Sequence, residues 1–135
     1  MRLQKNYVIL TCAAVLLLGG VLVVEGCVNN KSTTELISDL KSDQEKDRMT
    51  AVRTLPVNSE EADRVIPALI EALKDTQSDI RLSAAIKLGN YGEKAKEAIP
   101  PLKIALKDRD ARVRTAAAKA LAKIDPNSAP KNSSD

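Results

Sequence analysis

The sequence contains no histidine, tryptophan or phenylalanine among its 135 residues, and only two tyrosines and two cysteines. The lack of His excludes Ser-His and Cys-His nucleophile pairs, an imidazole general base and the ordinary zinc sites. Catalysis would therefore have to rest on carboxylates or lysines alone, and we expect no catalytic residue, no metal and no cofactor. With so few aromatic side chains, the core must be built from Leu, Ile, Val and Ala, which favours helices over a sheet sandwich.

The charge pattern excludes a second class of protein. The sequence pI is near 8.9, but the basic residues form no run longer than two and are balanced by acidic neighbours along the chain. A single aromatic residue after the N-terminal segment, Tyr91, is available for stacking on bases. We therefore expect no nucleic-acid partner.

Residues 1–26 have the three parts of a secretory signal: Arg2 and Lys5, an uncharged and mostly apolar run over residues 7–24, and a small residue, Gly26, at the end. The four residues that end in Gly26 and Cys27 resemble the lipobox of bacterial lipoproteins, in which the Cys is acylated and becomes the new N-terminus. Glu25 departs from that pattern. Two alternatives stay open, a cleaved lipoprotein with lipid on Cys27 and an uncleaved membrane anchor.

Both alternatives place the rest of the chain on the same side of a membrane. The positive-inside rule keeps the basic start in the cytoplasm, so we expect the folded part to lie in the bacterial cell envelope. Residues 27–33 then serve as a linker. Residues 126–135, rich in Ser, Asn and Pro with no apolar period, predict a disordered tail.

The chain repeats itself at an offset of 33 residues. The same shift relates a first, more divergent unit to the second, as in Leu36 with Leu69 and Arg48 with Arg81, so the sequence predicts three units. Eleven identities relate the second unit to the third: Ile66 with Ile99, Pro67 with Pro100, Leu69 with Leu102, Ala72 with Ala105, Leu73 with Leu106, Lys74 with Lys107, Asp75 with Asp108, Arg81 with Arg114, Ala84 with Ala117, Ala85 with Ala118 and Leu88 with Leu121.

Each unit predicts two helices. Apolar residues recur at three and four residue steps before a polar turn and again after it. We expect Pro67 and Pro100 in the first turn of the first helix of their units, and Gly89 and Gly92 to end the second helix of the middle unit. Residues 32–35 have the spacing of a capping box, so the first helix should begin at Ser32.

This unit, I-P-x-L-x-x-A-L-K-D, a polar turn, then V/I-R-x-x-A-A-x-x-L, resembles a HEAT repeat, in the short bacterial form also found in the phycobilisome lyase family. The resemblance implies an all-α superhelix, or solenoid, of about three helical hairpins over residues 34–125. It also implies a protein-binding or scaffolding module rather than an enzyme. Chromophore attachment of the phycobilin lyase type is the enzymatic alternative, which a bound tetrapyrrole would reveal.

Charged residues that recur once per unit suggest a structural device. Asp75, Arg81, Asp108 and Arg114 resemble a ladder in which each Arg reaches the Asp of an adjacent unit and helps to set the stacking angle. Ser42 replaces the Asp in the first unit, so we expect the ladder to be incomplete there.

A partner surface is expected where units differ on an exposed helix face. If Ile80, Ala84 and Leu88 point inward, positions 82 and 86 lie on the opposite side of the helix. An apolar centre flanked by cations is then a candidate contact patch for an unidentified protein partner. The six candidates from the three units are Met49, Arg53, Leu82, Ile86, Thr115 and Lys119.

Self-association through the end of the stack is the alternative role. It rests on Ala116, Ala120 and Lys123 of the last helix, which we expect to lie where a fourth unit would pack, with Lys119 and Lys123 as the competing solubilising cap.

Overall fold

The computed structural model describes residues 31–127, in which every regular element is helical. The predicted all-α solenoid is therefore confirmed. The elements are α1 (Thr33–Asp39), α2 (Glu45–Thr54), α3 (Ala62–Ala72), α4 (Ser78–Tyr91), the 3-10 segment η1 (Gly92–Ala98), α5 (Ile99–Ala105) and α6 (Ala111–Ile124).

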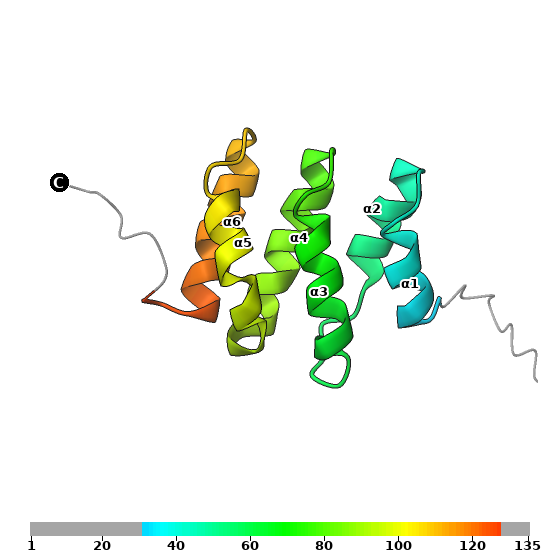
Figure 1. The fold of residues 1–135 in the computed structure, drawn as a ribbon, viewed down its shortest axis with the longest axis horizontal. Coiled ribbons are helices and arrows are strands. Elements are labelled where there is room, and N and C mark those ends of the chain that lie inside the picture. Colours follow the sequence, from blue (N-terminus) through cyan, green and yellow to red (C-terminus); the bar gives the residue numbers. More distant parts are fainter. Residues whose placement is uncertain (1–30, 128–135) are drawn as a thin grey trace, which may run out of the picture.

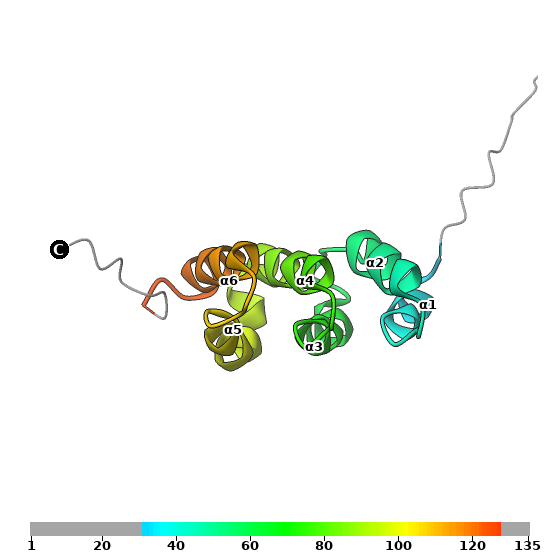
Figure 2. The same ribbon diagram turned by 90° about the horizontal axis from the view of Figure 1, so that it is seen from above.

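The helices form three antiparallel hairpins, α1–α2, α3–α4 and α5–α6, which stand side by side in chain order (Figure 1). Seen from above, α1, α3 and α5 make one layer and α2, α4 and α6 make the other (Figure 2). Each hairpin therefore contacts only its neighbours along the stack, as in other repeat proteins.

The core runs between the two layers and is aliphatic, as the composition predicts. Its largest fully buried side chains are those of Leu and Ile at repeated positions, such as Leu55, Leu88 and Leu121, one per unit. The alanines of the repeat are also buried, with Ala84, Ala85 and Ala117 fully excluded from solvent. Small side chains at these sites let helices of adjacent hairpins approach closely.

Gly89 provides the closest of these approaches, and it lies inside α4 rather than at its end. A Cβ atom on Gly89 would lie 2.9 Å from the Ala120 Cα atom of α6. The expectation that Gly89 ends the helix is wrong, because its missing side chain makes room for a neighbouring backbone. The helix ends at Gly92, whose φ of 56° favours glycine.

The two prolines of the repeat occupy different places. Pro100 lies in the first turn of α5, as expected. Pro67 lies inside α3, which begins one turn earlier at Ala62, so the prediction for Pro67 is wrong. In the third unit Pro100 is followed by Pro101, and two successive residues without an N–H cannot continue a regular ladder of helical hydrogen bonds. The 3-10 segment η1 takes the place of that extra turn.

The first helix begins as the sequence predicts. The Glu35 amide donates to the Ser32 hydroxyl at 3.3 Å, and the Ser32 amide donates to the Glu35 carboxylate at 2.8 Å. These two bonds are the capping box. The predicted signal or anchor, Cys27 and all but the last residues of the 27–33 linker lie outside the described residues, as does most of the 126–135 tail. Within residues 31–127, no helix is long and apolar enough to cross a membrane.

Candidate functional site

Recurrent Arg and Asp side chains join each hairpin to the next. Arg48 of the first unit donates to Asp75 of the second from Nε at 2.7 Å and from Nη2 at 3.2 Å. Arg81 of the second unit donates to Asp108 of the third from Nε at 2.7 Å and from Nη2 at 2.8 Å. Both pairs are bidentate, which fixes direction as well as distance between neighbouring hairpins.

The remaining nitrogen of each guanidinium holds the arginine's own hairpin. Arg81 Nη1 donates to the carbonyl oxygens of Asp75 and Thr76, at 2.7 and 3.1 Å, in the turn between α3 and α4. Arg48 and Arg114 make the same pair of bonds to the turns of the first and third units. One side chain therefore closes a turn and also reaches the adjacent unit.

The aspartates also act within their own turns. Asp75 accepts from the Gln77 amide at 2.8 Å, and Asp108 accepts from the Asp110 amide at 2.9 Å. In the first unit the Ser42 hydroxyl takes this place, accepting from the Gln44 amide at 3.1 Å. A hydroxyl suffices there because no earlier hairpin among the described residues presents an Arg to position 42.

Pairing and burial set the charge of these groups. Hydrogen bonds from the Arg81 guanidinium and the Asp110 amide hold the pKa of Asp108 below its ordinary value, against a smaller opposing effect of burial. Burial favours a higher pKa for Asp75, but the bonds from Arg48 and the Gln77 amide outweigh it and lower that pKa. Both carboxylates are therefore ionised at neutral pH, opposite charged arginines.

The open end of this ladder lies at the third unit, not at the first. Ser42 interrupts nothing, since Arg48 of its unit still reaches Asp75. Arg114, by contrast, meets no carboxylate of another unit within residues 31–127. The expectation that Ser42 marks the incomplete end is therefore wrong, because each Arg pairs with the Asp of the following unit and not of the preceding one.

The candidate contact patch coincides with a groove between α4 and α6, which we call the α4–α6 groove. Its volume is about 490 Å³. Four of the six candidate residues line it, while Met49 and Arg53 of α2 lie outside it. The lining residues are Leu82, Ala85, Ile86 and Gly89 of α4, and Ala111, Arg112, Thr115, Ala116, Lys119, Ala120 and Lys123 of α6.

The α4–α6 groove has an apolar wall and a cationic rim. Ile86 is 49% exposed, one of the few large apolar side chains that reach solvent. Arg112 of the rim is engaged by Asp79 at 2.9 Å and by Asp110 at 2.8 Å. Lys119 is exposed and has no charged or hydrogen-bonded partner in the described part of the chain.

Two residues expected at the free end of the stack lie in this groove instead. Ala116 and Ala120 are buried and face α4, and Ala120 is the residue that Gly89 admits. The prediction that a fourth unit would pack on them is wrong, because helix α6 turns this face toward the preceding hairpin. Lys123 also points backward, donating to the Asn90 side chain of α4 at 3.1 Å.

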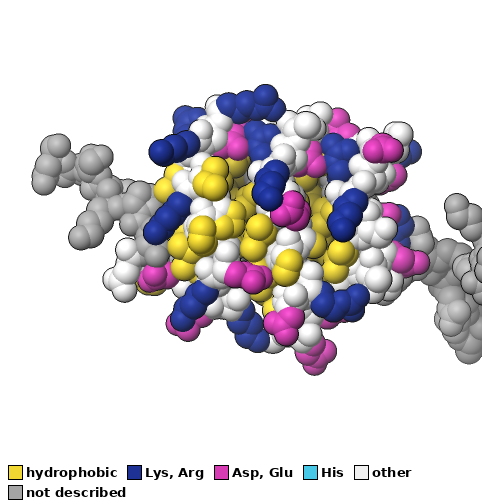
Figure 3. All heavy atoms as spheres, in the orientation of Figure 1, with side chains coloured by type: hydrophobic (Ala, Val, Ile, Leu, Met, Phe, Trp, Pro, Cys, Tyr) yellow, Lys and Arg dark blue, Asp and Glu magenta, His cyan; other side chains and the backbone are white. Residues whose placement is uncertain are grey.

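The opposite layer carries a feature that the sequence reasoning missed. Figure 3, which views the layer of α1, α3 and α5, shows hydrophobic side chains in the furrows between these helices. Ile104 is 75% exposed beside a hollow that Leu73 and Pro101 also line. The repeat offered a signal, since the residue 33 positions earlier is Glu71.

Chemistry of another kind finds little support in the described residues. No group of three His, Cys, Asp or Glu residues in this part of the chain is placed to hold a metal ion. Glu61, beside the loop into α3, accepts from the Thr33 hydroxyl at 2.6 Å and so ties the first two hairpins together.

Comparison with known proteins agrees with the geometry. The family model described as HEAT repeats matches residues 33–122, which are all three hairpins. Comparison with curated proteins finds no matching sequence. HEAT repeats generally mediate protein interaction or scaffolding, and the family is typically non-catalytic. From the repeated Arg–Asp pairs, the paired helical layers and this match, the chain belongs to the HEAT-repeat family.

Proposed function

We propose that this protein is a scaffolding module of the cell envelope that binds a protein partner in the α4–α6 groove. The observation that carries the proposal is the exposed Ile86 on an apolar wall, opposite the unpaired Lys119. A groove between parallel helices of a solenoid accepts a helix or an extended segment, whose apolar side chains would cover Ile86 and Leu82.

The charges of the groove favour a partner segment with an acidic residue. Arg112 is already neutralised by two carboxylates, whereas Lys119 is free to pair with one from outside. Burial of the apolar wall would supply the affinity, and the Lys119 contact would fix the orientation of the segment. No catalytic step is part of this proposal.

Attachment to the membrane rests on the sequence before Ser32. The basic start, the apolar run and the lipobox-like Cys27 support acylation of Cys27, with the helical domain held close to the membrane on a short linker. More than one acyl chain, as in lipoproteins, is needed for stable retention. Replacement of Cys27 by Ala should release the processed chain from the membrane fraction.

The groove is tested by crosslinking in intact cells, followed by mass spectrometry of the captured proteins. The full-length double variant Leu82→Asp with Ile86→Lys should lose the captured partner while it retains its helical circular dichroism and melting temperature. Ile104→Lys, on the opposite layer, is the matched control and should keep the partner. If the double variant folds and captures the same partner as the wild type, the groove is not the binding surface.

The same experiment tests the attachment. The N-terminal peptide of the captured protein should begin at Cys27 and carry the mass of its acyl groups. A peptide that begins at Met1 with an unmodified Cys27 would contradict the lipoprotein and favour the uncleaved anchor.

A further inference from the structure

The outer surface of the third hairpin is an uncovered copy of a surface that is buried elsewhere in the stack. Shifting by 33 residues carries Arg81, Ala85 and Gly89, which are all buried in the α4–α6 junction, to Arg114, Ala118 and Ala122. Arg114 and Ala122 are exposed, and Ala118 is partly so. We call this surface, together with Leu106 of α5, the end face.

Arg114 on the end face is held in the conformation that its counterparts use to bind a carboxylate. Its Nη1 atom donates to the carbonyl oxygens of Asp108 and Arg109, at 2.9 and 3.2 Å, as Arg81 does in its own turn. In Arg81 the Nε and Nη2 atoms then grip Asp108. In Arg114 these two donors have no partner among the residues that the structure describes. The turn thus already orders the guanidinium that would receive a carboxylate.

Neighbouring charges on the end face have the same sign. Lys103 and Lys107 of α5 occupy the positions that Ile70 and Lys74 hold in the second hairpin, and both are exposed without an acidic partner in the described residues. Figure 3 shows basic side chains along the edge of the molecule at α5. The replacement of Ile70 by a lysine at position 103 adds a cation to a surface that is apolar in the middle of the stack.

A second copy of the chain does not complement this surface. The first hairpin would have to present position 42 to Arg114, and Ser42 carries a hydroxyl in place of the carboxylate. Its outward positions that correspond to the buried Ala116 and Ala120 are Thr50 and Thr54, which are exposed and polar. Stacking of copies in repeat register would therefore leave Arg114 unpaired and bury polar side chains.

Close packing by one more repeat is also opposed at Ala122. This residue stands where Gly89 admits the backbone of α6, so its Cβ would meet a helix placed in the same way. The first junction shows that the Arg–carboxylate pair does not require the glycine. There Pro56 holds the equivalent position, yet Arg48 lies 2.7 Å from Asp75, and α2 stands farther from α4 than α6 does (Figure 2).

We propose that the end face docks a second, acidic protein, which places an Asp or Glu carboxylate on Arg114 in the bidentate geometry of the internal ladder. Lys103 and Lys107 lie beside that carboxylate and favour further acidic residues of the partner. This surface is distinct from the α4–α6 groove, so the proposal goes beyond the function proposed above, and the protein would bridge two partners.

The test is site-specific photocrosslinking with the full-length chain in intact cells. A photoreactive amino acid is placed at Ala122 on the end face, and at Ser38 of α1 at the other end of the stack as the positional control. Crosslinking at Ala122 is then repeated with Arg114→Glu and Arg114→Gln. Arg109→Glu, which makes the same charge change in an exposed side chain one turn away, is the matched control.

We expect a heterologous protein to be captured at Ala122 and not at Ser38. Its yield should fall at least tenfold with both Arg114 variants and stay near the wild-type yield with Arg109→Glu. Changing the acidic residue of the captured protein to Arg should restore capture by Arg114→Glu, an outcome that mere loss of folding cannot produce. Capture of a second copy, capture that is unaffected at Arg114, or no capture at Ala122 would each overturn the proposal, and none of them bears on the α4–α6 groove.

Discussion

Arg81 and Asp108 form a bidentate ion pair across the junction of the second and third hairpins, with Nε 2.7 Å and Nη2 2.8 Å from the two carboxylate oxygens. Only 6% of the Arg81 side chain and 11% of the Asp108 side chain are exposed. The same guanidinium closes its own turn, so the pair couples the conformation of one turn to the position of the next hairpin.

Loss of the Asp108 carboxylate should destabilise the fold. Asp108→Ala leaves the buried Arg81 charge without its partner, and we expect a decrease of about 3 kcal/mol in the free energy of unfolding. Urea denaturation followed by circular dichroism measures it. Asp79→Ala, which removes the partner of the exposed Arg112, is the control and should change the stability far less. An unaltered stability of Asp108→Ala would show that the ladder is not a stabilising device.

Acid should remove the contribution of the ladder. The folded-state pKa of Asp108 lies below its ordinary value of 3.8, so its ionisation stabilises the fold above the unfolded-state pKa. This stabilisation is lost as the pH falls from about 4 through the folded-state pKa. The difference in unfolding free energy between wild type and Asp108→Asn should therefore be constant at neutral pH and shrink in this acid range. A difference that is independent of pH would contradict the assignment.

Gly89 should not tolerate a side chain. A Cβ there lies 2.9 Å from the Ala120 Cα atom, and because this atom belongs to the backbone, α4 and α6 must separate. Overpacking of this kind costs about 1–3 kcal/mol, so Gly89→Val should lower the melting temperature. Ala122→Val places the same side chain at the corresponding exposed position and is the matched control. Similar melting temperatures for the two variants would show that the junction opens without cost.

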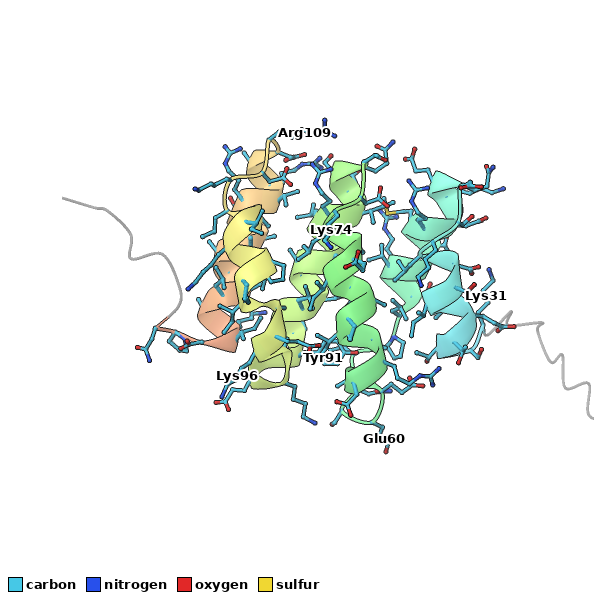
Figure 4. All side chains as sticks on the ribbon, in the orientation of Figure 1. Lys31, Glu60, Lys74, Tyr91, Lys96 and Arg109 are labelled. Atoms are coloured by element: carbon cyan, nitrogen blue, oxygen red, sulfur yellow. The ribbon has the colours of Figure 1, made fainter. Side chains whose placement is uncertain are left out.

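Tyr91 should stabilise the junction of the first two hairpins through its hydroxyl group. It lies at the end of α4 (Figure 4) and donates to the Pro56 carbonyl oxygen at 2.7 Å, in the loop after α2. The nearby Lys87 ammonium donates to the Leu55 carbonyl oxygen, and burial lowers its pKa. Tyr91→Phe leaves the Pro56 carbonyl without this donor and should reduce stability by about 1 kcal/mol. Hydrogen exchange should show the loss as faster exchange in α2, and unchanged protection there would refute the role.

The fold was largely predictable because a repeat shows its pattern several times. One apolar stripe per helix, a polar turn and an offset of 33 residues suffice to predict hairpins, since no single hairpin can bury its stripe alone. The predictions failed where two sequence features have more than one structural use. Gly89 was consistent with a helix end and is a contact point between helices, and Pro67 was consistent with a helix start and lies within α3.

The candidate site was predictable only in part. Helical periodicity placed Leu82 and Ile86 on the outer face of their helix, and both line the α4–α6 groove. Periodicity gives the angle around one helix and not the position of its neighbour. It therefore could not separate Met49 and Arg53, which lie outside the groove, from Thr115 and Lys119, which line it, nor could it show that Ala116 and Ala120 face backward.

The sequence by itself determined the repeat, the helical hairpins, the aliphatic core and the capping box at Ser32, because each depends on residues close together in the chain or on a spacing that recurs. Only the tertiary structure decided the direction of the Arg–Asp ladder and which end of it stays open. An alignment shows that Arg48, Arg81 and Arg114 are equivalent, but it gives no sign to the stacking. The packing of one hairpin on the next supplies that sign, and it leaves Arg114 as the arginine of the ladder without a carboxylate in the described part of the chain.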